Sequence, residues 1–105
     1  MSNILVFDTS SAWCSVTLSA KGIIHSVAEM QPRKHAQLIM PMIDDVCQRA
    51  GIKPTELDGI AFGKGPGSFT GVRIAISVAQ DLSLATGARL YGIFFKQKTA
   101  YEIVM

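Results

Sequence analysis

The residues best suited to chemistry lie in a glycine-rich loop, whose composition favours either phosphate binding or a turn. The stretch GKGPGSFTGVR, residues 63–73, stands between an apolar run and a segment with helical periodicity. Backbone N–H groups at a helix N-terminus stabilise an anion, and glycines let a phosphate approach closely. The spacing completes neither the P-loop nor the Gly-x-Gly-x-x-Gly pattern. Ser68 and Thr70 could instead cap the helix, using the N–H groups that a phosphate would need.

A second candidate site is the stretch DTSS, residues 8–11, which follows a short apolar run. Asp8 could hold a hydrated metal ion at the end of a buried strand, or its carboxylate could accept hydrogen bonds from its own turn. The stretch resembles the first phosphate loop of the actin-like ATPases, but it lacks the glycine that usually follows the aspartate. The residues that a nucleotide would contact are Asp8, Ser10, Gly65, Gly67 and Ser68.

The remaining reactive side chains predict neither a catalytic nor a metal-binding set. His25 falls within an expected strand and His35 at an expected helix start, and neither has a Cys, Asp or Glu partner at the spacing of a triad or a metal site. The two cysteines, Cys14 and Cys47, are spaced for neither a metal nor a disulfide framework. Asp44 and its neighbour Asp45 are typical of a solvated helix face.

Length and composition favour one soluble domain without a membrane segment. The chain has 105 residues, of which 49% are hydrophobic, and a net charge of +2. This is enough apolar material for a core. The basic residues are scattered, so composition gives no sign of direct nucleic-acid binding. No apolar run approaches the roughly 18 residues of a membrane span. We expect a cytoplasmic location.

The order of expected elements predicts an α/β fold. An apolar strand near the N-terminus precedes a hairpin that turns at residues 20–22, and a helix follows over residues 34–50. A strand from residue 59, a helix over 70–86 and a strand from residue 89 complete the order. A hairpin followed by strand–helix–strand crossovers predicts a mixed five-stranded sheet with flanking helices, as in a ribonuclease-H-like lobe.

Both expected helices carry more apolar residues than one side of a sheet can cover, which predicts a helix-on-helix interface. The apolar positions of the second helix spread about twice as far as the ~100° stripe that a sheet requires. On the first helix, Leu38 and Met42 fall outside the main apolar arc, which comprises Ala36, Ile39, Met40, Ile43, Val46, Cys47 and Ala50. Small residues on the second helix would let another helix come close. The interface residues expected on this basis are Leu38, Met42, Val72, Ala75, Ile76 and Ala79.

Three stretches together resemble the bacterial TsaB family, also called YeaZ. They are ILVFDTSSAWCSVTL, PRKHAQLIMPMI and GKGPGSFTGVRIAISVAQDLSLA. The most specific is the Gly-x-Gly-Pro-Gly-Ser-Phe-Thr-Gly-x-Arg motif of residues 63–73. The resemblance implies the N-terminal lobe of an actin-like (ASKHA) fold over residues 1–93. It also favours the loop as a turn that sets up the second helix and helps form a surface for a partner, with any nucleotide contact secondary.

The resemblance further implies a non-catalytic partner of TsaD in making threonylcarbamoyladenosine next to the anticodon of tRNA. TsaD transfers the threonylcarbamoyl group and the TsaE ATPase joins the complex, so the expected partners are TsaD, TsaE-like proteins, a second copy of this chain, and tRNA through the complex. The resemblance implies no intrinsic cofactor, and it leaves ATP or ADP and magnesium as candidate ligands of the assembled complex. The alternative is an enzyme, either an actin-like ATPase or a protease. Residues 94–105 depart from the family and are expected to be foreign sequence.

Overall fold

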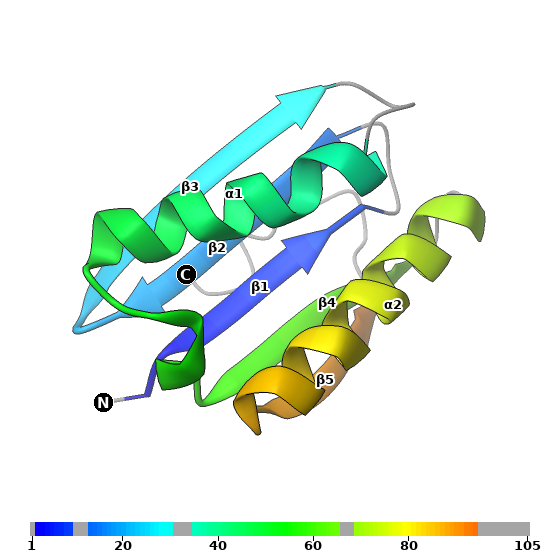
Figure 1. The fold of residues 1–105 in the computed structure, drawn as a ribbon. Coiled ribbons are helices and arrows are strands. Elements are labelled where there is room, and N and C mark those ends of the chain that lie inside the picture. Colours follow the sequence, from blue (N-terminus) through cyan, green and yellow to red (C-terminus); the bar gives the residue numbers. More distant parts are fainter. Residues whose placement is uncertain (1, 10–12, 31–34, 66–68, 95–105) are drawn as a thin grey trace.

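A mixed five-stranded sheet forms the centre of the chain, with both helices packed on one of its faces. The computed structural model describes residues 2–9, 13–30, 35–65 and 69–94. The strands are β1 (Ile4–Asp8), β2 (Trp13–Ala20), β3 (Ile23–Met30), β4 (Gly59–Gly65) and β5 (Arg89–Phe94). The helices are α1 (His35–Ala50), the short 3₁₀ helix η1 (Pro54–Glu56) and α2 (Phe69–Thr86). Figure 1 shows α1 lying over β2 and β3, and α2 over β4 and β5.

The strand order β3-β2-β1-β4-β5 confirms the predicted mixed sheet. β1 pairs antiparallel with β2 and parallel with β4, and β4 pairs parallel with β5. The β2–β3 hairpin was predicted from the residues of its turn. The two parallel pairings, β1 with β4 and β4 with β5, each require a helical crossover between the paired strands. Residues 66–68 and 95–105, which include part of the glycine loop and most of the tail expected to be foreign, lie outside the described residues.

β1 is the centre of the core. Leu5 and Phe7 point toward the helices and are fully buried, and Val6 on the opposite face of the strand is 1% exposed. Full burial of a side chain such as Leu5 or Phe7 contributes about 2 kcal/mol. The register places Leu5 beside Leu18 of β2 and Ile60 of β4. The apolar run read from the sequence therefore becomes a strand buried on both faces.

The N-terminal ends of the parallel strands are held together by a cluster of polar contacts at Asn3 and Asp58. The backbone N–H of Asn3 donates to Oδ2 of Asp58 at 2.7 Å, and the backbone N–H of Asp58 donates back to the carbonyl of Asn3 at 2.8 Å. The side-chain amide of Asn3 also donates to the carbonyl of Glu56 at 3.0 Å. The backbone N–H of Arg89 reaches the carbonyl of Asp58 at 3.2 Å, so β1, β4 and β5 start in a fixed mutual register.

Helix α1 contains Pro41 yet runs without interruption from His35 to Ala50. A proline inside a helix removes one N–H donor and crowds the carbonyl four residues before it. The buried face of α1, with Ile39, Ile43 and Val46 all fully buried, supplies enough packing to offset that cost.

The sequence signals for turns and helix ends are confirmed. Lys21 and Gly22 both have positive φ, 55° and 78°, as a two-residue hairpin turn of the sheet-compatible type requires. Gly51 ends α1 at φ 72°, where its N–H donates to the carbonyl of Gln48 and that of Ile52 donates to the carbonyl of Cys47. This is a Schellman arrangement, and it satisfies two carbonyls at the end of α1.

We predict that Gly51→Ala lowers the free energy of unfolding by about 1 kcal/mol, because an L side chain is strained at positive φ. A Cβ at Gly51 meets no atom within 4 Å, so the cost comes from the backbone and not from a clash. Urea denaturation checks this, with Lys53→Ala on the exposed neighbouring turn as the control. Equal stabilities for Gly51→Ala and the wild type would contradict it.

Candidate functional site

The candidate site lies where the C-terminal ends of β1 and β4 meet the start of α2. β1 ends at Asp8, which is 4% exposed, and Thr9 follows with no exposed surface. β4 ends at Gly65 after a register irregularity between Gly63 and Gly65 opposite β5. Figure 1 shows these ends and the first turn of α2 at one edge of the sheet. Ligands of open α/β sheets bind at the carboxyl ends of parallel strands, so this is the edge where a ligand is expected.

A buried hydrogen bond joins the segment after β1 to α2. The hydroxyl Oγ1 of Thr9 donates to the carbonyl of Gly71 at 2.6 Å. Gly71 is itself buried in the first turns of α2. This contact spans 62 positions of the sequence and fixes Thr9, directly after β1, relative to the start of α2. Sequence analysis did not identify Thr9, because a single threonine after a strand carries no spacing signal.

The five residues expected to contact a nucleotide are only partly described. Asp8 is buried at the end of β1, beside Ser15 of β2 in the sheet register. Gly65 closes β4 opposite Phe94 of β5. Ser10, Gly67 and Ser68 lie outside the described residues, as does the predicted capping role of Ser68. The structure thus places Asp8 and Gly65 at the same end of two adjacent strands, and their contact with a nucleotide stays a prediction.

Cys14 is buried on the helix-facing side of β2, close enough to the site to interact with Asp8. Burial, together with the negative charges of Asp8 and Glu29, raises the pKa of the Cys14 thiol to about 11. Burial also raises the pKa of Cys47, with a second contribution from Asp44. Both thiols are therefore protonated at neutral pH and lack the thiolate character that a nucleophile needs. In the part of the chain that the structure describes, no group of three His, Cys, Asp or Glu side chains could hold a metal ion.

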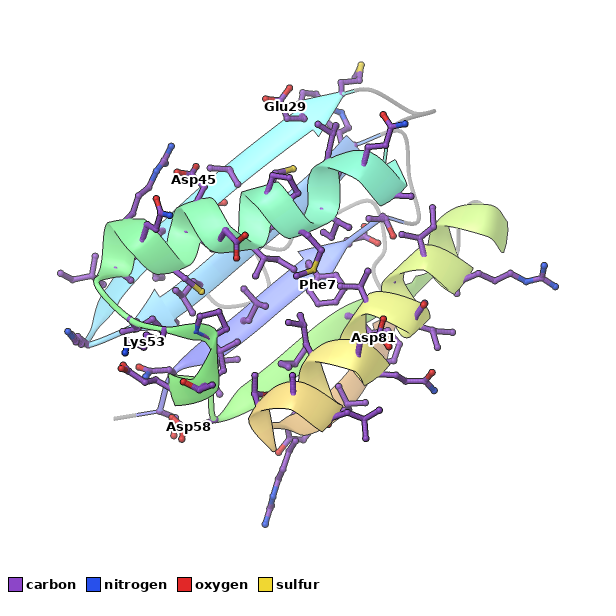
Figure 2. All side chains as sticks on the ribbon, viewed as in Figure 1. Phe7, Glu29, Asp45, Lys53, Asp58 and Asp81 are labelled. Carbon is purple, nitrogen blue, oxygen red and sulfur yellow. The ribbon has the colours of Figure 1, made fainter. Side chains whose placement is uncertain are left out.

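Figure 2 shows the side chains on both helices, and their burial corrects half of the predicted interface. Ala75 and Ala79 have no exposed surface and Met42 is 6% exposed, so these three residues lie in the core of the chain. Met40, which was expected on the buried arc of α1, is 41% exposed. The buried face of α1 is thus rotated toward Met42 by a fraction of a turn, relative to the arc expected from the sequence. The small side chains of Ala75 and Ala79 let α2 pack closely within the core of its own chain.

The other three predicted interface residues are half-buried. Leu38 packs against the core, on the same face of α1 as Asp45 seven residues later. Asp45 projects on the side of α1 that lies toward β3 (Figure 2). Val72 and Ile76 share a flank of α2, whereas Ile74 and Val78 pack against the core from the other flank. Leu38 and the Val72–Ile76 pair therefore remain accessible to a partner.

Comparison with known proteins shows the family. The family model for TsaD, described as tRNA N6-adenosine threonylcarbamoyltransferase, matches residues 15–103. The tRNA threonylcarbamoyladenosine biosynthesis protein TsaB of Escherichia coli (strain K12) is 42% identical over 90 residues, covering 86% of this chain and 39% of that protein. The structure of YeaZ from Pseudomonas aeruginosa superposes with a TM-score of 0.86 at 46% identity, covering 90% of this chain and 44% of that chain. The chain belongs to the TsaB/YeaZ family.

The match also confirms the predicted fold class, a ribonuclease-H-like lobe of the actin-like superfamily. The chain spans about two fifths of the length of the curated TsaB/YeaZ proteins it matches. A tRNA N6-adenosine threonylcarbamoyltransferase of Porphyromonas gingivalis (strain ATCC BAA-308 / W83) is 41% identical over 61 residues, 58% of this chain. No helix among the described residues is both long and apolar enough to cross a membrane. The foreign origin of residues 94–105 stays a prediction.

We predict that Thr9→Val lowers the free energy of unfolding by about 1 kcal/mol, because it removes the buried hydrogen bond that Oγ1 of Thr9 donates to the carbonyl of Gly71. Thr9→Ser keeps the hydroxyl and is the matched control, which we expect to lose much less. Urea denaturation of both variants measures the difference. A Thr9→Val variant as stable as the wild type, with a loss only in Thr9→Ser, would show that the methyl group matters and the hydrogen bond does not.

We predict that ionisation of Cys14 makes stability fall at alkaline pH. Below the ordinary thiol pKa of 9.0 the thiol is protonated in both the folded and the unfolded chain, so its full contribution is present. Between 9.0 and about 11 only the unfolded chain loses the proton, so the free energy of unfolding decreases as pH rises. Urea denaturation across this window should give a steeper decrease for the wild type than for Cys14→Ala. If the free energy of unfolding decreased equally with pH in the wild type and in Cys14→Ala, the raised pKa of Cys14 would be contradicted.

Proposed function

We propose that the protein to which this chain belongs takes part in the biosynthesis of threonylcarbamoyladenosine in tRNA. The observation that carries the proposal is the match to TsaB proteins over most of this chain, at 42% identity in Escherichia coli and 46% in the Pseudomonas aeruginosa YeaZ structure. The transferase relatives match a shorter part, 58–64% of the chain. The TsaB role is therefore favoured over that of the transferase. Such a protein would work in the cytoplasm, where tRNA is modified.

Within that pathway we propose an interaction role, as a subunit that binds TsaD while TsaD transfers the threonylcarbamoyl group. TsaE-like proteins would join the same assembly, and tRNA would be reached through it. The geometry supports this role through the helices, because Leu38, Val72 and Ile76 keep accessible apolar surface beyond what the sheet covers. The buried hydrogen bond from Thr9 to Gly71 supports a structural function of the glycine-rich loop, since it fixes the start of α2. Any ATP, ADP or magnesium would then bind in the assembled complex.

We expect Leu38→Glu combined with Ile76→Glu to prevent association with TsaD, because each change places a charge in an apolar contact. Sedimentation velocity of the 105-residue chain mixed with TsaD measures association. Ile23→Glu is the matched control, because Ile23 is 58% exposed at the β2–β3 turn and is not one of the expected interface residues. Unchanged association of the folded double variant would exclude these residues from the interface.

The cellular role is tested with the full-length protein. Cells depleted of their own TsaB, supplied with the full-length protein carrying the same two substitutions, should contain less threonylcarbamoyladenosine in their tRNA, as measured by mass spectrometry. The Ile23→Glu protein should restore the modification. A wild-type full-length protein that restores none would refute the pathway itself, whereas normal modification by the double variant would refute only the interface.

A further inference from the structure

The buried side of α2 carries a stripe of small residues. Gly71, Ala75 and Ala79 recur every four positions, and all three are buried, the two alanines with no exposed surface. Positions four apart lie on one face of a helix. Glycine and alanine let α2 pack closely, but they have no long side chain that could interlock with its neighbours. Packing along this stripe therefore fixes how deep α2 lies in the core more firmly than it fixes the rotation of the helix about its axis.

The rotation of α2 decides where its flanks point. Val72 and Ile76, the outer flank, each follow a residue of the stripe and so lie about 100° around the helix from it. Ile74 and Val78 lie about as far around on the other side and pack against the core. A helix with its side chains is about 10–12 Å across, so a rotation of about 20° moves an outer side chain by about 2 Å. The packed centre of a protein interface is as dense as a protein interior, so a shift of this size spoils its fit.

The hydrogen bond from Thr9 restrains this rotation at the start of α2. Oγ1 of Thr9 lies 2.6 Å from the carbonyl oxygen of Gly71, the first residue of the stripe. In an α-helix the same carbonyl accepts from the N–H four residues later, and its second lone pair is available to the threonine. A hydrogen bond weakens steeply away from its preferred angles. Thr9 therefore holds the first turns of α2 in one orientation relative to β1.

The far end of α2 is held by contacts of another kind. Oγ of Ser83 donates to the carbonyl of Ala88 at 2.8 Å, and Oγ1 of Thr86 donates to the carbonyl of Leu82 at 2.7 Å. The backbone N–H of Ala88 donates to Oγ1 of Thr86 at 3.2 Å. These bonds span at most five positions, so they join α2 to the turn that leads into β5. The bond from Thr9 differs because it joins the start of α2 to the segment after β1, 62 positions away.

We propose that Thr9 is a positioning residue for the outer flank of α2. It has no exposed surface with which to contact a partner, so it acts through the helix: its hydroxyl holds the rotation that presents Val72 and Ile76. The inference rests on the proposed function, in which this flank binds TsaD. Loss of the hydroxyl therefore weakens association with TsaD in addition to lowering the stability of the chain.

Isothermal titration calorimetry of the 105-residue chain with TsaD tests this role, at a temperature where circular dichroism shows every variant folded. Thr9→Val keeps the shape of the side chain without its donor, and its Kd is about tenfold higher than that of the wild type. Thr9→Ser keeps the hydroxyl and binds within about twofold of the wild type. Gly51→Ala is the matched control, because it destabilises the chain through the backbone at the end of α1 and binds TsaD like the wild type. A merely structural role of Thr9 would make Thr9→Val behave like Gly51→Ala.

Two double-mutant cycles locate the effect on α2. Ile76→Ala removes one of the side chains that Thr9 positions, so adding Thr9→Val to it raises the Kd by less than tenfold. Leu38→Ala removes an apolar side chain from α1, which the bond from Thr9 does not hold, so adding Thr9→Val there raises the Kd by the full factor. Equal factors in the two backgrounds overturn the proposal, because Thr9 then acts elsewhere than through the flank of α2.

The remaining outcomes separate this inference from the proposed function. Should Thr9→Val not fold, Thr9→Ala and Thr9→Ser differ only in the hydroxyl, and the same tenfold difference in Kd is expected between them. Equal Kd values for Thr9→Val and Gly51→Ala overturn the positioning role and leave the proposed function intact. A wild-type chain that does not bind TsaD refutes the proposed interaction and the positioning role with it.

Discussion

Burial of β1 on both faces is the constraint on which the rest of the structure depends. The strand has neighbours on both sides, antiparallel β2 and parallel β4, and its residues Leu5 to Asp8 are all at least nine-tenths buried. A strand in this position is covered by apolar side chains on both faces. Its backbone N–H and C=O groups must form hydrogen bonds with a neighbouring strand on each edge. β2, the next strand in the sequence, pairs with one edge of β1. The strand on the other edge, β4, follows only after the crossover through α1.

The two ends of β1 are fixed by different kinds of contact. At the start, Asn3 and Asp58 exchange backbone and side-chain hydrogen bonds that align the parallel strands. At the far end, Thr9 reaches across to Gly71 in α2. The first set of contacts sets the register, and the second sets the position of the helix that follows the glycine-rich loop. The edge of the sheet where a ligand is expected is therefore built from segments that are distant in sequence.

The apolar residues of α2 are more numerous than the sheet requires, and they serve two purposes. α2 uses its alanines to lie close to the sheet, so Ala75 and Ala79 are fully buried, while Ile74 and Val78 extend the core along one flank. The apolar residues left over, Val72 and Ile76, are then on the flank that the chain itself does not cover completely. Val72 and Ile76 were both expected from the periodicity of the sequence, whereas Ala75 and Ala79, which were expected with them, lie in the core.

Local signals in the sequence determined the elements, the turns and the fold class. The apolar run of β1, the Lys21–Gly22 turn and the helix end at Gly51 each depend on interactions within a few residues, so they were predictable. The motif of residues 63–73 indicated the family for a similar reason, since it is a contiguous stretch. Only the tertiary structure decided which side of each helix faces the sheet, because a rotation of a fraction of a turn exchanges Met42 for Met40 in the core. It alone also joined Thr9 to Gly71 and left β3 at the edge of the sheet, since contacts between distant segments have no local pattern.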